Sequence, residues 1–240
     1  MKKELVISIF DYEPYWIKFL NKDIKVSMYR KGESKLKDNE ILIEPNVGRD
    51  VHTFFKHILV NYDNLSDITF FCQDFPFDHW ENIIQTVNGD EIIHRQNAQM
   101  VIGGYYGYHY NTYRENGNRG VIPTYGIEKI KGGGMWNMYN SFHHGGKCIS
   151  CMSSGLPQHE EDLNLDYWWH LLFKNSNPDH YEFIPGGHFA ITSNHARTRS
   201  KNFYNRIINL LEKEKNFPWI MERFGPYIFN PNYIELDELK

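Results

Sequence analysis

Two polar segments of this sequence combine residue types and spacings that suit chemistry. The first is NVGRD at 46–50, followed at 51–62 by a run whose apolar residues recur at helical spacing. Gly48 allows a close turn before this helix, and a helix N-terminus presents backbone N–H groups with positive dipole character. The segment is therefore suited to binding a phosphate, and Asp50 is predicted to cap the helix.

The second polar segment follows an apolar run. The residues ITFFC at 68–72 predict a buried strand, and QDFPFDH at 73–79 places Asp74 and Asp78 just beyond its end. In open α/β sheets ligands bind beyond the carboxyl ends of the strands, so these two carboxylates are candidate site residues. The alternative is that Asp74 is a turn residue capping the following loop, and that Asp78 and His79 form a surface pair.

Two later segments contain carboxylates in distinctive surroundings. Glu161 and Asp162 precede an amphipathic run, where acidic residues are also the ordinary signal of a helix start. Glu222 stands beside Arg223 in the aromatic and apolar segment 217–229. A charged pair in such surroundings is either partnered or functional.

The first 80 residues contain the elements that must position these groups. Apolar, β-branched runs predict strands at 4–10, 24–29, 41–45 and 68–72, alternating with connections and with the helix at 51–62. This alternation is typical of a mostly parallel sheet with helices against it, so the predicted fold class is α/β.

The later part of the chain changes in composition. Residues 103–146 hold 11 of the 18 glycines and 7 of the 16 tyrosines, which favours loops that form a substrate surface, with disorder as the alternative. Beyond them we expect a helix within 159–174, a strand at 181–193 interrupted by a proline and a glycine pair, and a helix at about 200–213.

Composition limits the classes of function. With 26 basic and 30 acidic residues, nucleic acid and anionic membranes are disfavoured partners, and 240 residues suffice for one large domain. The short apolar start and three cysteines predict neither a signal peptide nor a disulfide framework, and indicate a cytoplasmic protein without an integral membrane segment.

Cys148 and Cys151, with His143 and His144 upstream, could be half of a zinc site, although free thiols are the simpler interpretation. The histidines show no H-E-x-x-H spacing that would support a metal hydrolase.

In order, the segments ISIFDYEP, VSMYRKGES, NVGRD, ITFFCQDFPFD and PGGHFAITS, with EED or MER as the acidic element, resemble the GT-A fold of glycosyltransferases that use nucleotide sugars. The resemblance covers most of the chain and is nearest to the capsular and rhamnan polysaccharide transferases. The sequence is also similar to a group of fungal, bacterial and viral proteins with NVGR, PFDH and GGxFAxS motifs.

The resemblance implies a single GT-A-like (Rossmann-like) domain over 1–240, with a mostly parallel central sheet flanked by helices. Residues 1–80 would form the nucleotide-binding half and 81–240 the acceptor-binding half. The implied activity, in polysaccharide biosynthesis, moves a sugar from a nucleoside diphosphate sugar to a glycan or other hydroxyl acceptor, with inversion and a carboxylate base. The alternative is a non-catalytic carbohydrate-binding protein on a degenerate transferase scaffold.

The resemblance also assigns residues to this activity. A metal, Mn²⁺ or Mg²⁺, would be held by Asp74 and Asp78, which replace the family's usual D-x-D. The base would be Glu222, which follows the glycine-rich segment as the family order requires, or else Glu161 or Asp162. The acceptor would lie against Gly186, Gly187 and His188, although His188 could equally be a hydrogen-bonded strand histidine. The nucleotide sugar would contact Asp11, Tyr12, Arg30, Lys31, Asn46, Gly48, Arg49, Asp50, Gln73 and Asp74.

Overall fold

We describe the protein from a computed structural model. The description covers the backbone alone at 110–115, 118–129, 137–140, 180 and 185, and otherwise includes residues 1–32, 36–43, 45–98, 100–108, 163–178 and 181–236.

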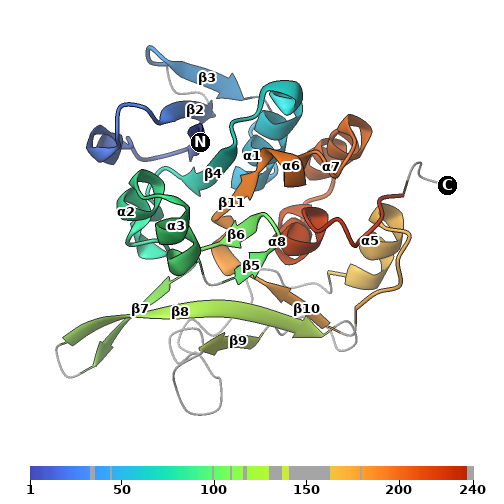
Figure 1. Ribbon diagram of the computed structural model, residues 1–240. Coiled ribbons are helices and arrows are strands. Elements are labelled where there is room, and N and C mark those ends of the chain that lie inside the picture. Colours follow the sequence, from blue (N-terminus) through green and yellow to red (C-terminus); the bar gives the residue numbers. More distant parts are fainter. Residues whose placement is uncertain are drawn as a thin grey trace.

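A seven-stranded sheet forms the centre of the molecule, with the strand order β3-β2-β1-β4-β11-β6-β5 (Figure 1). The first four strands of this order are mutually parallel, and β11, β6 and β5 continue the sheet with antiparallel pairings. The order reverses between β1 and β4, which makes their carboxyl ends the switch point of the sheet. The strands are β1 Lys3–Ile9, β2 Lys25–Lys31, β3 Glu40–Ile43, β4 Ile68–Gln73, β5 Met100–Ile102, β6 Tyr105–Gly107 and β11 Phe189–Thr192.

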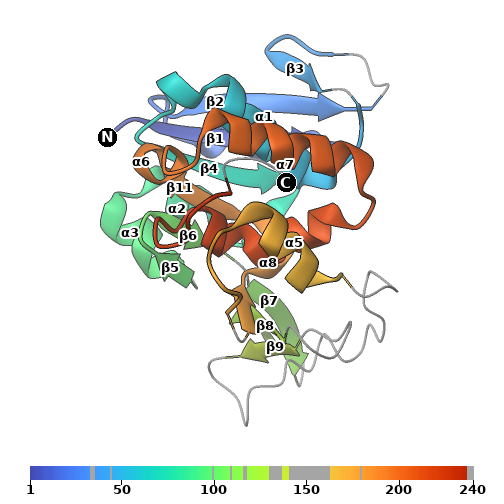
Figure 2. The ribbon, with the colours of Figure 1, turned by 90° about the vertical axis from the view of Figure 1, so that its right-hand side faces the viewer.

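Helices cover both faces of this sheet (Figures 1 and 2). Helices α1, α5, α7 and α8 pack on one face, and α2 and α3 pack on the other. Their bounds are α1 Arg49–Val60, α2 Ile83–Asn88, α3 Glu91–Asn97, α5 Leu165–Leu172, α6 Ser193–Ala196, α7 Lys201–Lys213 and α8 Phe217–Ile228. Short 3-10 helices are η1 Tyr15–Phe19, η2 Tyr62–Asn64, η3 Pro76–Asp78 and η5 Pro185–Gly187.

The alternation of side chains along the strands creates two separate cores. In β1, Leu5 and Ile7 point into the core beneath α2, while Val6 points into the core beneath α1. In β4, Phe70 points into the core beneath α2 and Phe71 into the core beneath α1. Because a strand buried on both faces must be apolar at every position, this arrangement explains the continuous apolar runs of the sequence.

A second, smaller sheet lies beside the first (Figure 2). It pairs β10 His180–Phe183, β8 Asn118–Lys129 and β7 Tyr110–Glu115, with β9 Asn137–Asn140 also on β8, and all of these pairings are antiparallel. The α8 hydroxyl of Tyr227 accepts a hydrogen bond from the N–H of Glu182 in β10, at 2.8 Å. This contact links the small sheet to the helical face.

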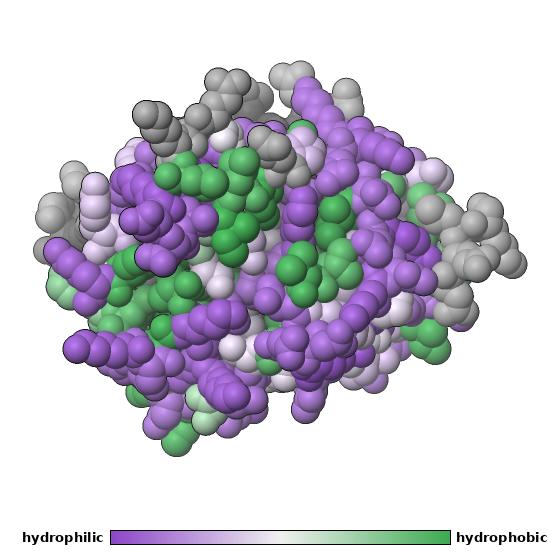
Figure 3. Space-filling view, turned by 90° about the horizontal axis from the view of Figure 1, so that it is seen from above, coloured by the Kyte–Doolittle hydropathy of each residue, from purple (hydrophilic) through white to green (hydrophobic). Residues whose placement is uncertain are grey.

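One edge of the large sheet is β3, at the top of the molecule. Seen from above, apolar patches lie among hydrophilic residues (Figure 3), and on β3 the side chains of Ile41 and Leu42 are exposed. The strand has four residues, and a short edge strand offers few unpaired backbone groups to another chain.

The expected α/β class is confirmed, whereas the expected mostly parallel central sheet is not, since three of its described strand pairings are parallel and three are antiparallel. Antiparallel pairing arises where Gly103 and Gly104 form a two-residue turn, which joins β5 to β6 as a hairpin. The interpretation of 103–146 as loops is wrong for the described part of that range, which contains β6 and much of the small sheet. Likewise, the single interrupted strand at 181–193 is two strands, β10 and β11, in different sheets.

In the part of the chain that the structure describes, no helix is both long enough and apolar enough to span a membrane.

Buried neutral histidines predict acid sensitivity. His94 of α3 is packed edge-on against Phe70 and Tyr106, and its burial lowers its pKa from an ordinary 6.5 to about 4. Between these two pH values the unfolded chain binds a proton that the folded protein does not, so stability falls as the pH falls. We expect His94→Leu to reduce the pH dependence of the free energy of unfolding between pH 6 and pH 4, by up to about 1.4 kcal/mol per pH unit. Urea titrations at several pH values measure it.

The control is His170→Asn, which removes an exposed histidine and should leave the pH dependence unchanged. Parallel pH profiles for wild type and His94→Leu would contradict the prediction.

Candidate functional site

The carboxylate of Asp74 ties together the carboxyl ends of β1 and β4. Its Oδ2 accepts hydrogen bonds from three consecutive backbone N–H groups, those of Phe10, Asp11 and Tyr12, at 2.9, 3.0 and 2.9 Å. Its Oδ1 accepts from the N–H of Phe75 at 2.8 Å. Asp74 therefore holds the loop after β1 against the loop after β4, at the switch point of the sheet.

A left-handed turn leads into α1 beside this point. Gly48 and Arg49 have φ of 67° and 52°, and a Cβ at position 48 would lie 2.8 Å from the Cβ of His52, so the position requires glycine. The ammonium of Lys31 donates to the carbonyl oxygens of Val47, at 2.7 Å, and of Arg49. The N-cap of α1 is Gly48, which has no side chain to accept hydrogen bonds from the first N–H groups of the helix.

Asp50 lies in the first turn of α1, and its predicted role as the cap is wrong because the N-cap is Gly48. Burial raises the pKa of the Asp50 carboxyl, opposed by a hydrogen bond with Ser8 and the charge of Lys31, and Asp74 is close enough to raise it further. Burial in turn lowers the pKa of Lys31 to about 8, against the charge of Asp50. The start of α1 and the acidic end of β4 therefore converge at the end of β1.

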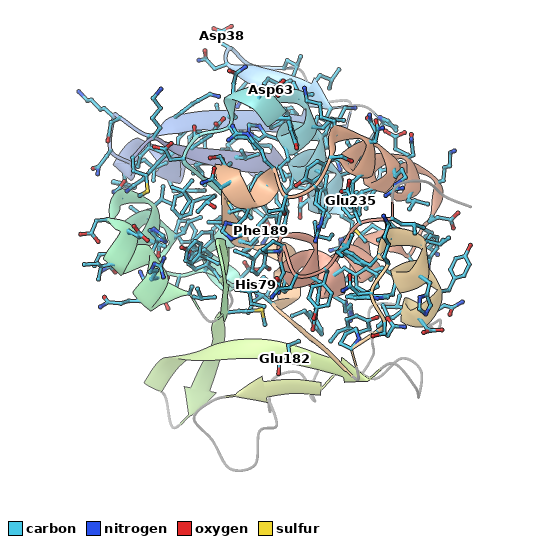
Figure 4. The ribbon with its side chains drawn as sticks, turned by 45° about the vertical axis from the view of Figure 1, so that its right-hand side comes forward. Asp38, Asp63, His79, Glu182, Phe189 and Glu235 are labelled. Carbon is cyan, nitrogen blue, oxygen red and sulfur yellow. The ribbon has the colours of Figure 1, made fainter. Side chains whose placement is uncertain are left out.

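A polar triplet extends the site beyond β4. Gln73 donates from Nε2 to the carbonyl oxygen of Phe75 at 3.0 Å and to Oδ1 of Asp78 at 3.2 Å. Oδ2 of Asp78 lies 3.4 Å from Nε2 of His79, with side-chain exposures of 50% and 35% respectively. Figure 4 shows His79 between the large and the small sheet, and η3 is in contact with β7.

The glycine-rich turn between β10 and β11 approaches this triplet. Gly186 and Gly187 have φ of 81° and 68°, and no atom of the described residues, its chain neighbours aside, lies within 4 Å of the place that a Cβ would take at Gly187. The next residue, His188, is buried, with its ring 6.0 Å from that of His79, and neither ring nitrogen has a hydrogen-bond partner among the described residues. Burial, together with His79, lowers the pKa of His188 to about 3, so the ring is neutral.

Glu222 of α8 holds the same turn. One carboxylate oxygen accepts from the N–H of Gly186, and the other accepts from the guanidinium of Arg223. Arg223 is buried, also donates to the carbonyl of Trp219 at 3.1 Å, and lies 4.6 Å from the ring centroid of Phe183. The internal ion pair that the sequence offered as an alternative role for Glu222 is therefore present.

Helix α8 also reaches the start of α1. The guanidinium carbon of Arg49 lies 4.4 Å from the ring centroid of Trp219, one turn before Glu222. Contacts therefore run continuously from α1 through α8 to the glycine-rich turn, and from there to the ends of β4 and β1. We refer to this set of segments as the switch-point site.

One family model matches residues 5–238. The chain belongs to that family, described as Protein of unknown function (DUF3431). No match was found among the curated proteins or the solved structures.

The residues that the sequence assigns to nucleotide-sugar binding differ in exposure and in partners in this DUF3431 protein. Tyr12 is exposed and its ring lies 5.6 Å from that of Phe75, and Asn46 is exposed beside the turn. Arg30 is buried, and its guanidinium is held by Glu40, with two contacts of 2.6 Å, and by Glu13 at 2.9 Å. Arg30 therefore anchors β2 to β3, and its Nε and Nη2 groups are engaged by these two carboxylates.

Two sets of predicted residues lie outside the described residues: the alternative bases Glu161 and Asp162, and the possible zinc ligands His143, His144, Cys148 and Cys151.

The expected metal ligands do not fit a divalent cation well. All of the polar contacts of Asp74 described above are with backbone N–H groups, which a cation would have to displace, and Asp78 is turned toward Gln73 and His79. Within the described ranges no group of three or more His, Cys, Asp or Glu side chains could hold a metal ion.

Two residues of the site were not assigned from the sequence. The sequence indicates His79 only as half of a surface pair with Asp78. Its closeness to His188 depends on how β4 and β11 pair in the sheet. Trp219 gave no signal because its contact with Arg49 joins distant parts of the chain. The Glu222–Arg223 pair in the same apolar segment was the available clue to α8.

The contacts of Asp74 predict a structural effect of its removal. We expect Asp74→Ala to lower the free energy of unfolding by about 2–4 kcal/mol, because four backbone N–H groups lose their acceptor. Urea denaturation without added metal measures it. The matched control is Asp78→Ala, at a half-exposed position, which should change stability by no more than about 0.5 kcal/mol. Equal free energies of unfolding for wild type and Asp74→Ala would show that the four hydrogen bonds of Asp74 do not stabilise the fold.

Proposed function

We propose that this protein is a glycosyltransferase that moves a sugar from a nucleoside diphosphate sugar to a glycan or other hydroxyl acceptor, with inversion at the anomeric carbon. The proposal includes the finer fold assignment, a GT-A-like domain, and a role in polysaccharide biosynthesis in the cytoplasm. The observation that carries it is the convergence of the start of α1 and the end of β4 at the end of β1, beside the glycine-rich turn.

The donor side of the proposed site has two basic side chains and several backbone N–H donors. The turn at Gly48 leaves the first N–H groups of α1 without a capping side chain, and such helix starts favour phosphate. Arg49 is exposed and supported by Trp219, and Lys31 lies beneath the turn. These groups would stabilise the charge that develops on the leaving diphosphate. Tyr12 and Phe75 would flank the nucleotide.

The acceptor side is formed by Gly186, Gly187 and His188. The open space at Gly187 lets a sugar approach the backbone, and the neutral, buried ring of His188 can exchange a hydrogen bond with a hydroxyl group. A base must then remove the proton of the acceptor hydroxyl as the anomeric carbon, which carries oxocarbenium-like charge, separates from the diphosphate.

A non-catalytic carbohydrate-binding protein is the second candidate. It is favoured by the occupied carboxylates of Asp74 and Glu222, since both are held by other groups of the chain. Glycan binding without any release of nucleoside diphosphate from donors would support it over the transferase.

A ligand-stabilisation experiment tests the proposal. A panel of UDP-glucose, UDP-galactose, GDP-mannose and dTDP-rhamnose is added to the protein, with and without Mn²⁺, and the melting temperature is measured. A donor at 100 times its Kd should stabilise the native state by about 2.7 kcal/mol, and Arg49→Ala should reduce the shift.

The control variant is Arg95→Ala, which removes an exposed arginine paired with Glu91 on α3, away from the turn. It should leave the donor-dependent shift intact. No shift with any donor would contradict the proposed function.

A further inference from the structure

The carboxylates near the glycine-rich turn differ in how far their oxygens are already engaged. Glu222 binds the N–H of Gly186 with one oxygen and the buried guanidinium of Arg223 with the other. Protonation of Glu222 would weaken its ion pair with the buried guanidinium of Arg223, which is costly. The geometry therefore suits Glu222 to holding the turn, and makes it a poor acceptor of a proton.

Asp78 is engaged differently. Its partners are the neutral amide of Gln73, at 3.2 Å, and the imidazole of His79, at 3.4 Å, and half of its side chain is exposed. Two partners from its own segment thus fix the orientation of the carboxylate while leaving it accessible. A positioned, accessible carboxylate is what proton abstraction from a hydroxyl requires.

An independent observation indicates that a ligand belongs beside Asp78. The ring of His188 follows the open turn at Gly187 and lies 6.0 Å from the ring of His79, the neighbour of Asp78. Its two nitrogens are buried without a hydrogen-bond partner among the residues described, and buried polar groups normally have one. A hydroxyl-bearing acceptor at Gly187 would supply that partner.

We propose that Asp78 is the general base of the transfer, that Gln73 and His79 position its carboxylate, and that His188 binds the acceptor. This inference rests on the proposed function. In the reaction Asp78 takes the proton of the acceptor hydroxyl, and the hydroxyl oxygen forms the new bond to the anomeric carbon. The bond from that carbon to the diphosphate oxygen breaks, and its electron pair leaves with the diphosphate.

The test measures the release of nucleoside diphosphate from the same four donors, with water as the acceptor. Asp78→Asn should lower kcat at least 100-fold with KM changed less than threefold, because it keeps the side-chain shape and loses the base. In Asp78→Ala, added formate should restore activity by supplying an external base. Glu222→Gln should keep kcat within about tenfold of wild type and lower the melting temperature instead.

Asp166 offers a matched control. It lies 3.5 Å from Nε2 of His170 and accepts a hydrogen bond from the amide of Asn177, so it has the same two kinds of partner as Asp78 but lies on the exposed side of α5. Asp166→Asn should leave kcat unchanged, and thermal unfolding checks that every variant is folded.

The outcomes separate the two proposals. If wild type releases diphosphate and folded Asp78→Asn keeps its kcat, the assignment of Asp78 is wrong while the transferase stands. Loss of kcat in Glu222→Gln with formate rescue of Glu222→Ala would move the base to Glu222. A wild type that releases no diphosphate from any donor overturns both proposals.

Discussion

The arrangement of the switch-point site depends on one carboxylate that bridges two strands. Strands β1 and β4 are neighbours in the sheet, but their backbone pairing ends at Ser8 and Gln73. Beyond the last paired residues, Asp74 connects the two strands by accepting hydrogen bonds from backbone N–H groups of the loop after β1 and of the loop after β4. Hydrogen bonds to an ionised acceptor are among the stronger ones in proteins, and an N–H group left without an acceptor in a buried place is costly. The loop that carries Tyr12 is therefore fixed relative to the segment that carries Asp78.

A second constraint comes from the burial of charge beneath the turn before α1. Lys31 is almost fully buried, yet its ammonium is satisfied by the carbonyl oxygens of Val47 and Arg49 and by the nearby charge of Asp50. Those carbonyls point inward because Gly48 and Arg49 adopt left-handed backbone conformations, which for Arg49 is unfavourable on its own. The lysine and the strained turn thus stabilise each other, and the turn presents Arg49 to Trp219 on the outside.

The sequence is sufficient to predict the parallel part of the fold, because each strand from β1 to β4 is a short apolar run and α1 has a clear helical period. It is insufficient for the antiparallel part, where Gly103 and Gly104 look like loop residues yet form the turn of a hairpin whose tyrosines are buried. The residues of the candidate site also differ in how far the sequence predicts them. The sequence indicates the segments at strand ends. The contacts of Arg30 with Glu40 and Glu13, and of Glu222 with the N–H of Gly186, join residues 10 to 36 positions apart and leave no periodic signal.

The carboxylates around the site therefore separate into two groups by the chemistry of their partners. Asp74 is bound by backbone donors, and Glu40 and Glu222 by buried arginines, so each of them is committed to holding an element in place. Loss of Asp74 would leave backbone N–H groups without their acceptor, and loss of Glu40 or Glu222 would remove a counter-charge from a buried arginine, so these three positions resist change for structural reasons. Asp78 has partners that hold it without neutralising an opposite buried charge. Asp74 and Asp78 are alike in residue type and in their position after a strand. Their partners separate them: backbone N–H groups hold Asp74, whereas two side chains contact the half-exposed Asp78.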